Sequence, residues 1–137
     1  MRRTWVASLV LFVLLVVAAC AIGCGGGGGR DVSTPSKALL GHWKNTVPGS
    51  KTEIYFSGDT ATFKSGTGPG IPVHYTIISQ DQKKFTLDVD YGASNAGGGP
   101  STLAFSSDRN TLLIHPKRVP EVLRYSYVNS EQKPLNK

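Results

Sequence analysis

The side chains with the greatest chemical potential in this chain are three histidines, a pair of aspartates and two cysteines. His42, His74 and His115 fall in three separate candidate strands, with no His-x-His pair, paired cysteine or acidic neighbour to complete a zinc site. Asp88 and Asp90 share one strand face about 7 Å apart, a spacing that paired-carboxylate glycosidases can use. Their alternation with apolar residues is fully explained by a solvated strand face. We therefore expect surface histidines, a wet aspartate face, no metal site and no cofactor.

Other motifs of catalysis or nucleic-acid binding do not appear in the sequence. There is no Gly-x-Ser-x-Gly elbow, and the glycine-rich segments at 66–70 and 97–100 do not open a helix as a phosphate loop would. The formal net charge is +6, to which Arg2 and Arg3 contribute, and the other basic residues are mostly scattered. Because no basic stripe or helix forms, we expect no nucleic-acid partner and no enzymatic activity, with no catalytic residues.

The first thirty residues have the composition of an export signal. Arg2 and Arg3 precede an uncharged run from residue 4 to residue 29 that is rich in Leu and Val and closes in small residues before Cys20. A positive start, an apolar centre and small residues at the end are typical of a signal helix that is removed on export. An uncleaved membrane anchor is the alternative, since about 20 apolar residues span a bilayer.

This segment resembles the signal of a bacterial lipoprotein, in which the cysteine after the small residues carries the lipid. Cys20 follows a branched residue and two alanines, whereas Cys24 has less suitable neighbours but precedes five glycines that suit a flexible spacer. The resemblance implies a signal peptide over 1–19, a lipid (palmitate) on Cys20 or alternatively Cys24, and a glycine-rich tether over 20–36. It also implies export and anchoring to the bacterial cell membrane or outer membrane, with the domain in the periplasm or outside the cell.

The remaining chain predicts an all-β domain that packing alone must hold, because no cysteine follows Cys24. A short helix is expected after Thr34-Pro35 and ends near Gly41. About eight short strands follow, and the clearest alternates Phe85, Leu87, Val89 and Tyr91 with polar residues. Such a meander closes into a small barrel or folds into a β-sandwich, over 37–128, before a flexible tail at 129–137. The expected strands are 42–47, 52–57, 60–64, 73–79, 85–91, 102–106, 111–115 and 122–128, with a mobile loop at 92–100.

Gly41 and Trp43 open the first strand after the short helix, and this Gly-x-Trp pattern resembles the start of lipocalin-like domains of small bacterial lipoproteins. The resemblance implies structural roles for Gly41 and Trp43, with the Trp43 ring closing the barrel floor. It also implies a barrel that binds a small apolar ligand. The alternative is a non-enzymatic envelope interaction or scaffold protein whose barrel is filled and whose partner is another envelope protein. The inward-facing residues expected to line a ligand are Phe63, Tyr75, Phe85, Leu87, Phe105 and Tyr125.

Overall fold

The computed structural model describes residues 29–92 and 99–134. Cys20, Cys24, the signal segment and most of the loop expected at 92–100 lie outside these residues, as do residues 135–137. Asp31–Lys137 is one compact unit. Every strand pairing and every core side chain described below lies in this unit, so it contains the contacts needed to fold on its own.

Within the described ranges, no helix is long and apolar enough to cross a membrane.

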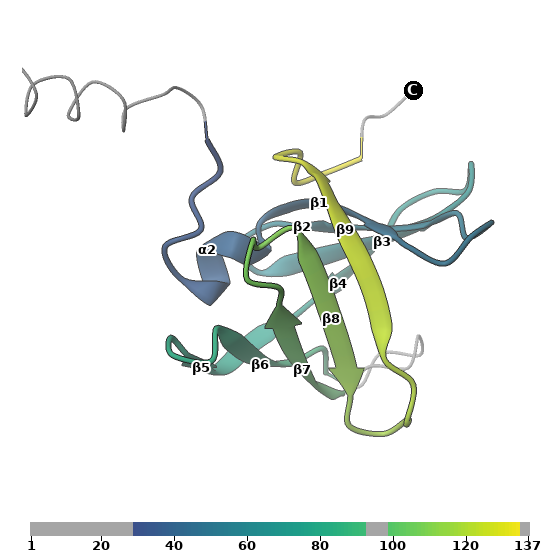
Figure 1. Ribbon diagram of the computed structural model, residues 1–137. Helices are drawn as coiled ribbons and strands as arrows, with labels where there is room; N and C mark the ends of the chain where they lie inside the picture. Colours follow the sequence, from purple (N-terminus) through teal and green to yellow (C-terminus); the bar gives the residue numbers. More distant parts are fainter. Residues whose placement is uncertain (1–28, 93–98, 135–137) are drawn as a thin grey trace, which may run out of the picture. The chain divides into compact units, whose positions relative to one another are not determined.

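The unit is all-β, as the sequence predicts, and its nine described strands form one antiparallel meander. The strand order is β4-β3-β2-β1-β9-β8-β7-β6-β5, so neighbours in the sheet are mostly neighbours in the sequence (Figure 1). Along β6, β7 and β8 inward and outward side chains alternate, so that buried residues alternate with partly buried or exposed ones. The strands are β1 (Gly41–Asn45), β2 (Thr52–Phe56), β3 (Thr60–Ser65), β4 (Ile71–His74), β5 (Thr76–Asp81), β6 (Thr86–Asp90), β7 (Pro100–Phe105), β8 (Thr111–Pro116) and β9 (Leu123–Asn129).

The sheet curls into a nearly closed barrel through the segment that contains β4 and β5. These strands stand at opposite ends of the sheet order, yet only Tyr75 separates them in the sequence. β4 pairs with β3, whereas β5 pairs with β6. The single strand expected over 73–79 is therefore two strands, because the chain leaves one neighbour before it joins the other. A register shift between Ile77 and Ser79 accounts for the broken alternation there.

One end of the barrel is covered by the short helix α2 (Pro35–Leu39). The Thr34 side chain caps the helix by accepting a hydrogen bond from the Lys37 N–H at 3.3 Å. Ala38 and Leu39 are fully buried, and α2 contacts β5 and β6. The Trp43 Nε1–H donates to the Leu39 carbonyl at 2.8 Å, which ties β1 to this helix.

Gly41 begins β1 in a conformation that favours glycine, with φ of 124°. A Cβ at this position would lie 2.6 Å from the Asn129 carbonyl oxygen and 2.9 Å from a ring carbon of Tyr127. β1 also pairs with β9 along an irregular register, with a shift between His42 and Trp43. The glycine therefore allows the first and last strands to approach closely.

Aromatic rings fill the barrel in two connected groups. At the α2 end, Trp43 packs on Tyr127 and Phe105, and Phe105 packs on Phe85, whose ring is covered by the Arg109 guanidinium at 3.4 Å. The second group continues from Phe56 to Tyr75, Tyr91 and Phe63, with ring centroids 5.8 to 6.2 Å apart. Both groups belong to one hydrophobic core.

Candidate functional site

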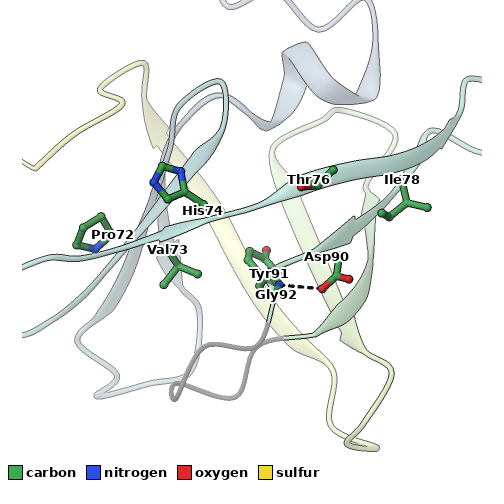
Figure 2. Close-up of a pocket in the computed structure, with 8 residues that line it drawn as sticks. All are labelled: Pro72, Val73, His74, Thr76, Ile78, Asp90, Tyr91 and Gly92. Carbon is green, nitrogen blue, oxygen red and sulfur yellow. Dashed lines mark hydrogen bonds between the residues drawn. The ribbon is translucent and has the colours of Figure 1, made fainter.

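A hollow of about 600 Å³ opens in the barrel wall beside β4, the start of β5 and the end of β6. Val73 and Ile78 lie on the side of the β4–β5 segment that faces Tyr91 and Asp90, whereas Pro72 and His74 project to the other side (Figure 2). The position is set by the topology, since β4 has a strand partner on only one side among the described residues. Its lining residues are Pro72, Val73, His74, Thr76, Ile78, Asp90, Tyr91 and Gly92.

The unpaired edge of β4 forms one wall of this hollow. The Tyr75 N–H donates to the Asp59 carbonyl at 3.0 Å, on the side of β3. Since successive residues of a strand point their backbone groups to opposite edges, those of Pro72 and His74 face away from β3. Proline has no N–H to leave unpaired, so Pro72 suits an open edge. No described strand pairs with this edge of β4, and the hollow opens there beside Tyr91.

Tyr91 contributes the aromatic floor of the hollow. Its ring packs against Phe63 and Tyr75, at centroid distances of 6.0 and 6.2 Å, and its backbone N–H donates to the Gly99 carbonyl at 3.2 Å. The ring is partly exposed, but the hydroxyl oxygen is buried and has no hydrogen-bond partner in the described part of the chain. Burial raises the pKa of the Tyr91 hydroxyl, and the nearby Tyr75 and Tyr125 raise it further.

The two neighbouring buried tyrosines have partners for their hydroxyls. Tyr75 donates to the Ser57 carbonyl at 2.6 Å, and Tyr125 interacts with the Asn45 side chain. Burial raises the pKa of Tyr75 to about 12 and also raises that of Tyr125, so both remain neutral near pH 7. Tyr91 is thus the one member of this trio whose hydroxyl the described residues leave without a partner.

Comparisons with protein-family models, with curated proteins and with solved structures found no match. The side chains of the site therefore provide the evidence for what it could bind. Among the described residues that line the hollow, none is a lysine or arginine and Asp90 is the one carboxylate. An Asp90 carboxylate oxygen accepts from the Gly92 N–H at 2.8 Å, which fixes this rim (Figure 2). An aromatic floor beside one carboxylate suits a neutral or cationic occupant better than an anion.

The six residues that the sequence proposes as ligand-lining are gathered in the barrel core. They pack against other side chains, and none of them lines the hollow beside β4. Tyr75 nevertheless supports the Tyr91 floor through ring contact. Five of them, Tyr75, Phe85, Leu87, Phe105 and Tyr125, are buried, and Phe63 is partly buried against the same core.

The three histidines lie on three different strands, β1, β4 and β8. His42 is buried, unlike the surface position that the sequence predicts. Its ring stacks flat on Tyr55 with ring centroids 4.1 Å apart, and its Nε2 lies 3.6 Å from Glu53, too far for a hydrogen bond. His74 reaches the hydroxyl of Thr60 at 3.4 Å, while His115 is exposed on β8. Over 29–92 and 99–134, no group of three or more His, Cys, Asp or Glu is placed to hold a metal ion.

Asp88 takes part in a small hydroxyl network outside the barrel. Its carboxylate accepts from Thr102 at 2.6 Å and from Ser79 at 3.0 Å. These two hydrogen bonds, the Thr102 bond foremost, lower the pKa of Asp88. A carboxylate that is so well satisfied by hydroxyls, and ionised, fits a structural link between β5, β6 and β7.

Sequence reasoning placed Tyr91 on the inward face of its strand but did not propose it as a site residue. The available signal was a tyrosine at the inward end of a strand, directly before a glycine-rich loop, where its hydroxyl needs a partner. Val73 and Thr76 were missed because the hollow depends on where the chain passes from β4, which pairs with β3, to β5, which pairs with β6. That change of partner is a property of strand pairing, which alternation alone does not determine.

Proposed function

We propose that this protein is an exported, lipid-anchored module of the bacterial cell envelope whose barrel binds a small, largely apolar ligand. The hollow beside β4 is the observation that carries the binding half of this proposal. Its volume of about 600 Å³ falls within the range of small-molecule sites, about 300 to 1,000 Å³. Its floor is aromatic, and its lining mixes apolar side chains such as Val73 and Ile78 with polar ones such as Thr76 and Asp90.

Binding belongs at the barrel wall in this proposal. The barrel centre is occupied by fully buried side chains such as Trp43, Phe56 and Leu103. A ligand there would have to displace packed rings, whereas the wall beside Tyr91 offers space without repacking. Two of the six inward residues expected from the sequence, Phe63 and Tyr75, then support the site through ring contacts with Tyr91.

A titration of Asp31–Lys137 with small aromatic ketones, followed by backbone NMR, tests the binding half. Shifts should concentrate at Val73, Thr76 and Gly92. The Thr76→Trp variant should abolish them, because Thr76 is exposed and its replacement fills the hollow. Gln80→Trp, exposed on the same strand and outside this hollow, is the matched control and should bind normally. Equal binding by both variants would mean that the ligand binds outside this hollow.

The anchoring half is tested by cell fractionation. The wild-type chain should take up labelled palmitate and sediment with membranes, because Cys20 or Cys24 carries the lipid in this proposal. Changing both cysteines to serine should abolish the label, and changing each alone should show which one is modified. Continued labelling of the double variant would refute lipid attachment at these cysteines.

The packed centre also favours a second candidate, a non-enzymatic envelope scaffold that acts through its surface. A barrel whose interior is filled by its own side chains needs no ligand to be stable. The NMR titration separates the two candidates, since a scaffold would show no saturable shifts around the hollow.

A further inference from the structure

A second concave site, the polar hollow, lies on the outer face of β5, β6 and β7. Its volume is about 540 Å³, within the range of small-molecule sites, and it shares no lining residue with the hollow beside β4. All the described residues that line it are polar. Three of them, Ser79, Gln80 and Lys84, are exposed, and the others are half-buried. A dissolved molecule can therefore reach this site directly from the solvent.

A row of three side chains forms the centre of the polar hollow. The register places Ser79 of β5 and Thr102 of β7 on either side of Asp88 of β6. The Ser79 hydroxyl donates to one oxygen of the Asp88 carboxylate at 3.0 Å, and the Thr102 hydroxyl donates to the other at 2.6 Å. A hydroxyl has one hydrogen to donate, so both oxygens remain acceptors for any further partner. Asp88 thus orients two acceptor oxygens at the surface of the polar hollow.

The rest of the lining adds a third hydroxyl, a second carboxylate and an ammonium group. Thr86 lies on the same half-buried face of β6 as Asp88, about 7 Å along the strand, and is paired with Asp81 of β5. One Asp81 oxygen accepts from the backbone N–H groups of Lys83 and Lys84 at 2.9 and 3.0 Å, which fixes this carboxylate at the end of β5. The Lys84 side chain supplies donors at the same edge.

The charges of the lining distinguish between classes of ligand. An anion would meet the carboxylates of Asp81 and Asp88. A metal ion would meet the ammonium of Lys84, and both oxygens of Asp88 already accept hydrogen bonds. A neutral molecule with several hydroxyl groups avoids both conflicts. Each of its hydroxyls can donate to an acceptor of the site and also accept from Lys84.

We propose that the polar hollow binds a neutral saccharide. The sugar hydroxyls donate to the oxygens of Ser79, Thr86 and Thr102, and another accepts from Lys84. Asp88 is a positioning residue, because it acts on the ligand through the two hydroxyls that it holds. This inference goes beyond the proposed apolar ligand, since it concerns a different face of the barrel and a different chemistry.

Titration of Asp31–Lys137 with maltose, cellobiose and chitobiose, followed by backbone NMR, tests the site. At least one of these disaccharides should produce saturable shifts at Thr86, Asp88 and Thr102. Gln80→Trp should abolish them, because Gln80 is exposed on β5 and the larger ring fills the polar hollow. Thr76→Trp, exposed on the same strand and outside the polar hollow, is the matched control and should bind normally.

A second variant tests one hydroxyl without disturbing the Asp88 network. Thr86→Val keeps the shape of the side chain and leaves the bonds from Ser79 and Thr102 in place. It should weaken disaccharide binding about fivefold, the loss expected for one net hydrogen bond, with an unchanged thermal midpoint. Thr52→Val, on β2 and outside the polar hollow, is the control and should bind as the wild type does.

The outcomes bear on this proposal alone. The absence of saturable shifts with all three disaccharides overturns it, as does equal binding by Gln80→Trp and Thr76→Trp. Unchanged affinity in Thr86→Val overturns the assigned contacts. The ketone titration concerns the other hollow, so its failure would leave saccharide binding unaffected, and the reverse also holds.

Discussion

Gly41 shows how one residue can set the approach of two strands that are distant in sequence. Its φ of 124° and the 2.6 Å separation between a built Cβ and the Asn129 carbonyl oxygen leave no room for a side chain. The Gly-x-Trp pattern in the sequence singles out this glycine. The strain itself depends on β9, which the pattern does not contain.

Gly41→Ala should therefore destabilise the domain strongly, by an amount above the roughly 1 kcal/mol of an average substitution. Gly58→Ala is the control, because Gly58 has open space around its Cα and no positive φ. Denaturant unfolding of both variants measures the difference. Equal stability of the two would mean that β1 and β9 can separate at little cost.

Asp88 supplies a second test at the level of single residues. Its lowered pKa arises first from the Thr102 hydroxyl and then from Ser79. Thr102→Val should raise the pKa of Asp88 toward its ordinary value of 3.8, and Ser79→Ala should raise it less. Because the folded-state pKa is depressed, the network stabilises the fold above pH 3.8, and this contribution is lost as the pH falls. Side-chain carboxyl NMR titration gives both values; a larger effect of Ser79→Ala would reverse the assigned order.

At the level of elements, α2 and Trp43 act together as the closure of one barrel end. Leu39 and Trp43 are fully buried and joined by the indole hydrogen bond to the Leu39 carbonyl. The compact unit begins at Asp31, ahead of the start at residue 37 that the sequence predicts, because the residues before the first strand cover the core.

Trp43→Ala should reduce the free energy of unfolding by about 3–5 kcal/mol, as expected for removal of a large buried ring. Trp43→Phe should cost less, since it keeps an aromatic ring against Tyr127 and Phe105 and loses mainly the bond to Leu39. Urea unfolding followed by circular dichroism measures both. A loss below about 1 kcal/mol in Trp43→Ala would show that this end of the barrel is dispensable.

The strands themselves were largely predictable from alternation. The pattern from Phe85 to Tyr91 places the inward face of β6 correctly, and the all-β meander follows from the number of such segments. The division of the expected strand at 73–79 was not predictable in this way. Its first half pairs with β3 and its second half with β6. The alternation of apolar and polar residues within a strand does not indicate which strand it pairs with. The hollow forms at this division, so it escaped prediction for the same reason.

At the level of the whole molecule, buried tyrosines make the fold sensitive to alkali. Burial raises the pKa values of Tyr55 and Tyr75 to about 12, and those of Tyr91 and Tyr125 are raised as well. In the unfolded chain tyrosines titrate near pH 10. The unfolded state therefore releases protons that the folded state retains, and stability should fall as the pH rises from 10 to about 12.

Denaturant unfolding across this pH range, with tyrosinate absorbance as a second signal, tests the prediction. Below pH 10 the titration of these tyrosines should not change the free energy of unfolding. Above pH 10 the free energy of unfolding should decline steadily. Tyr91→Phe should decline less steeply, because one raised pKa is removed. A stability that rises with pH in this range would contradict the burial of these tyrosines.

The pairing of β1 with β9 also has a consequence for the kinetics of folding. It is the one described ladder that joins strands distant in sequence, since the others connect successive strands. Distant segments lose more chain entropy on meeting, so this pairing should form after the rate-limiting step. Tyr127→Leu in β9 should then mainly speed unfolding, whereas Val89→Ala, in the local ladders of β6, should mainly slow folding. The middle of the sheet, where β1 pairs with β9, would thus control how long the native state lasts, and the local ladders on either side of it would control how quickly it forms.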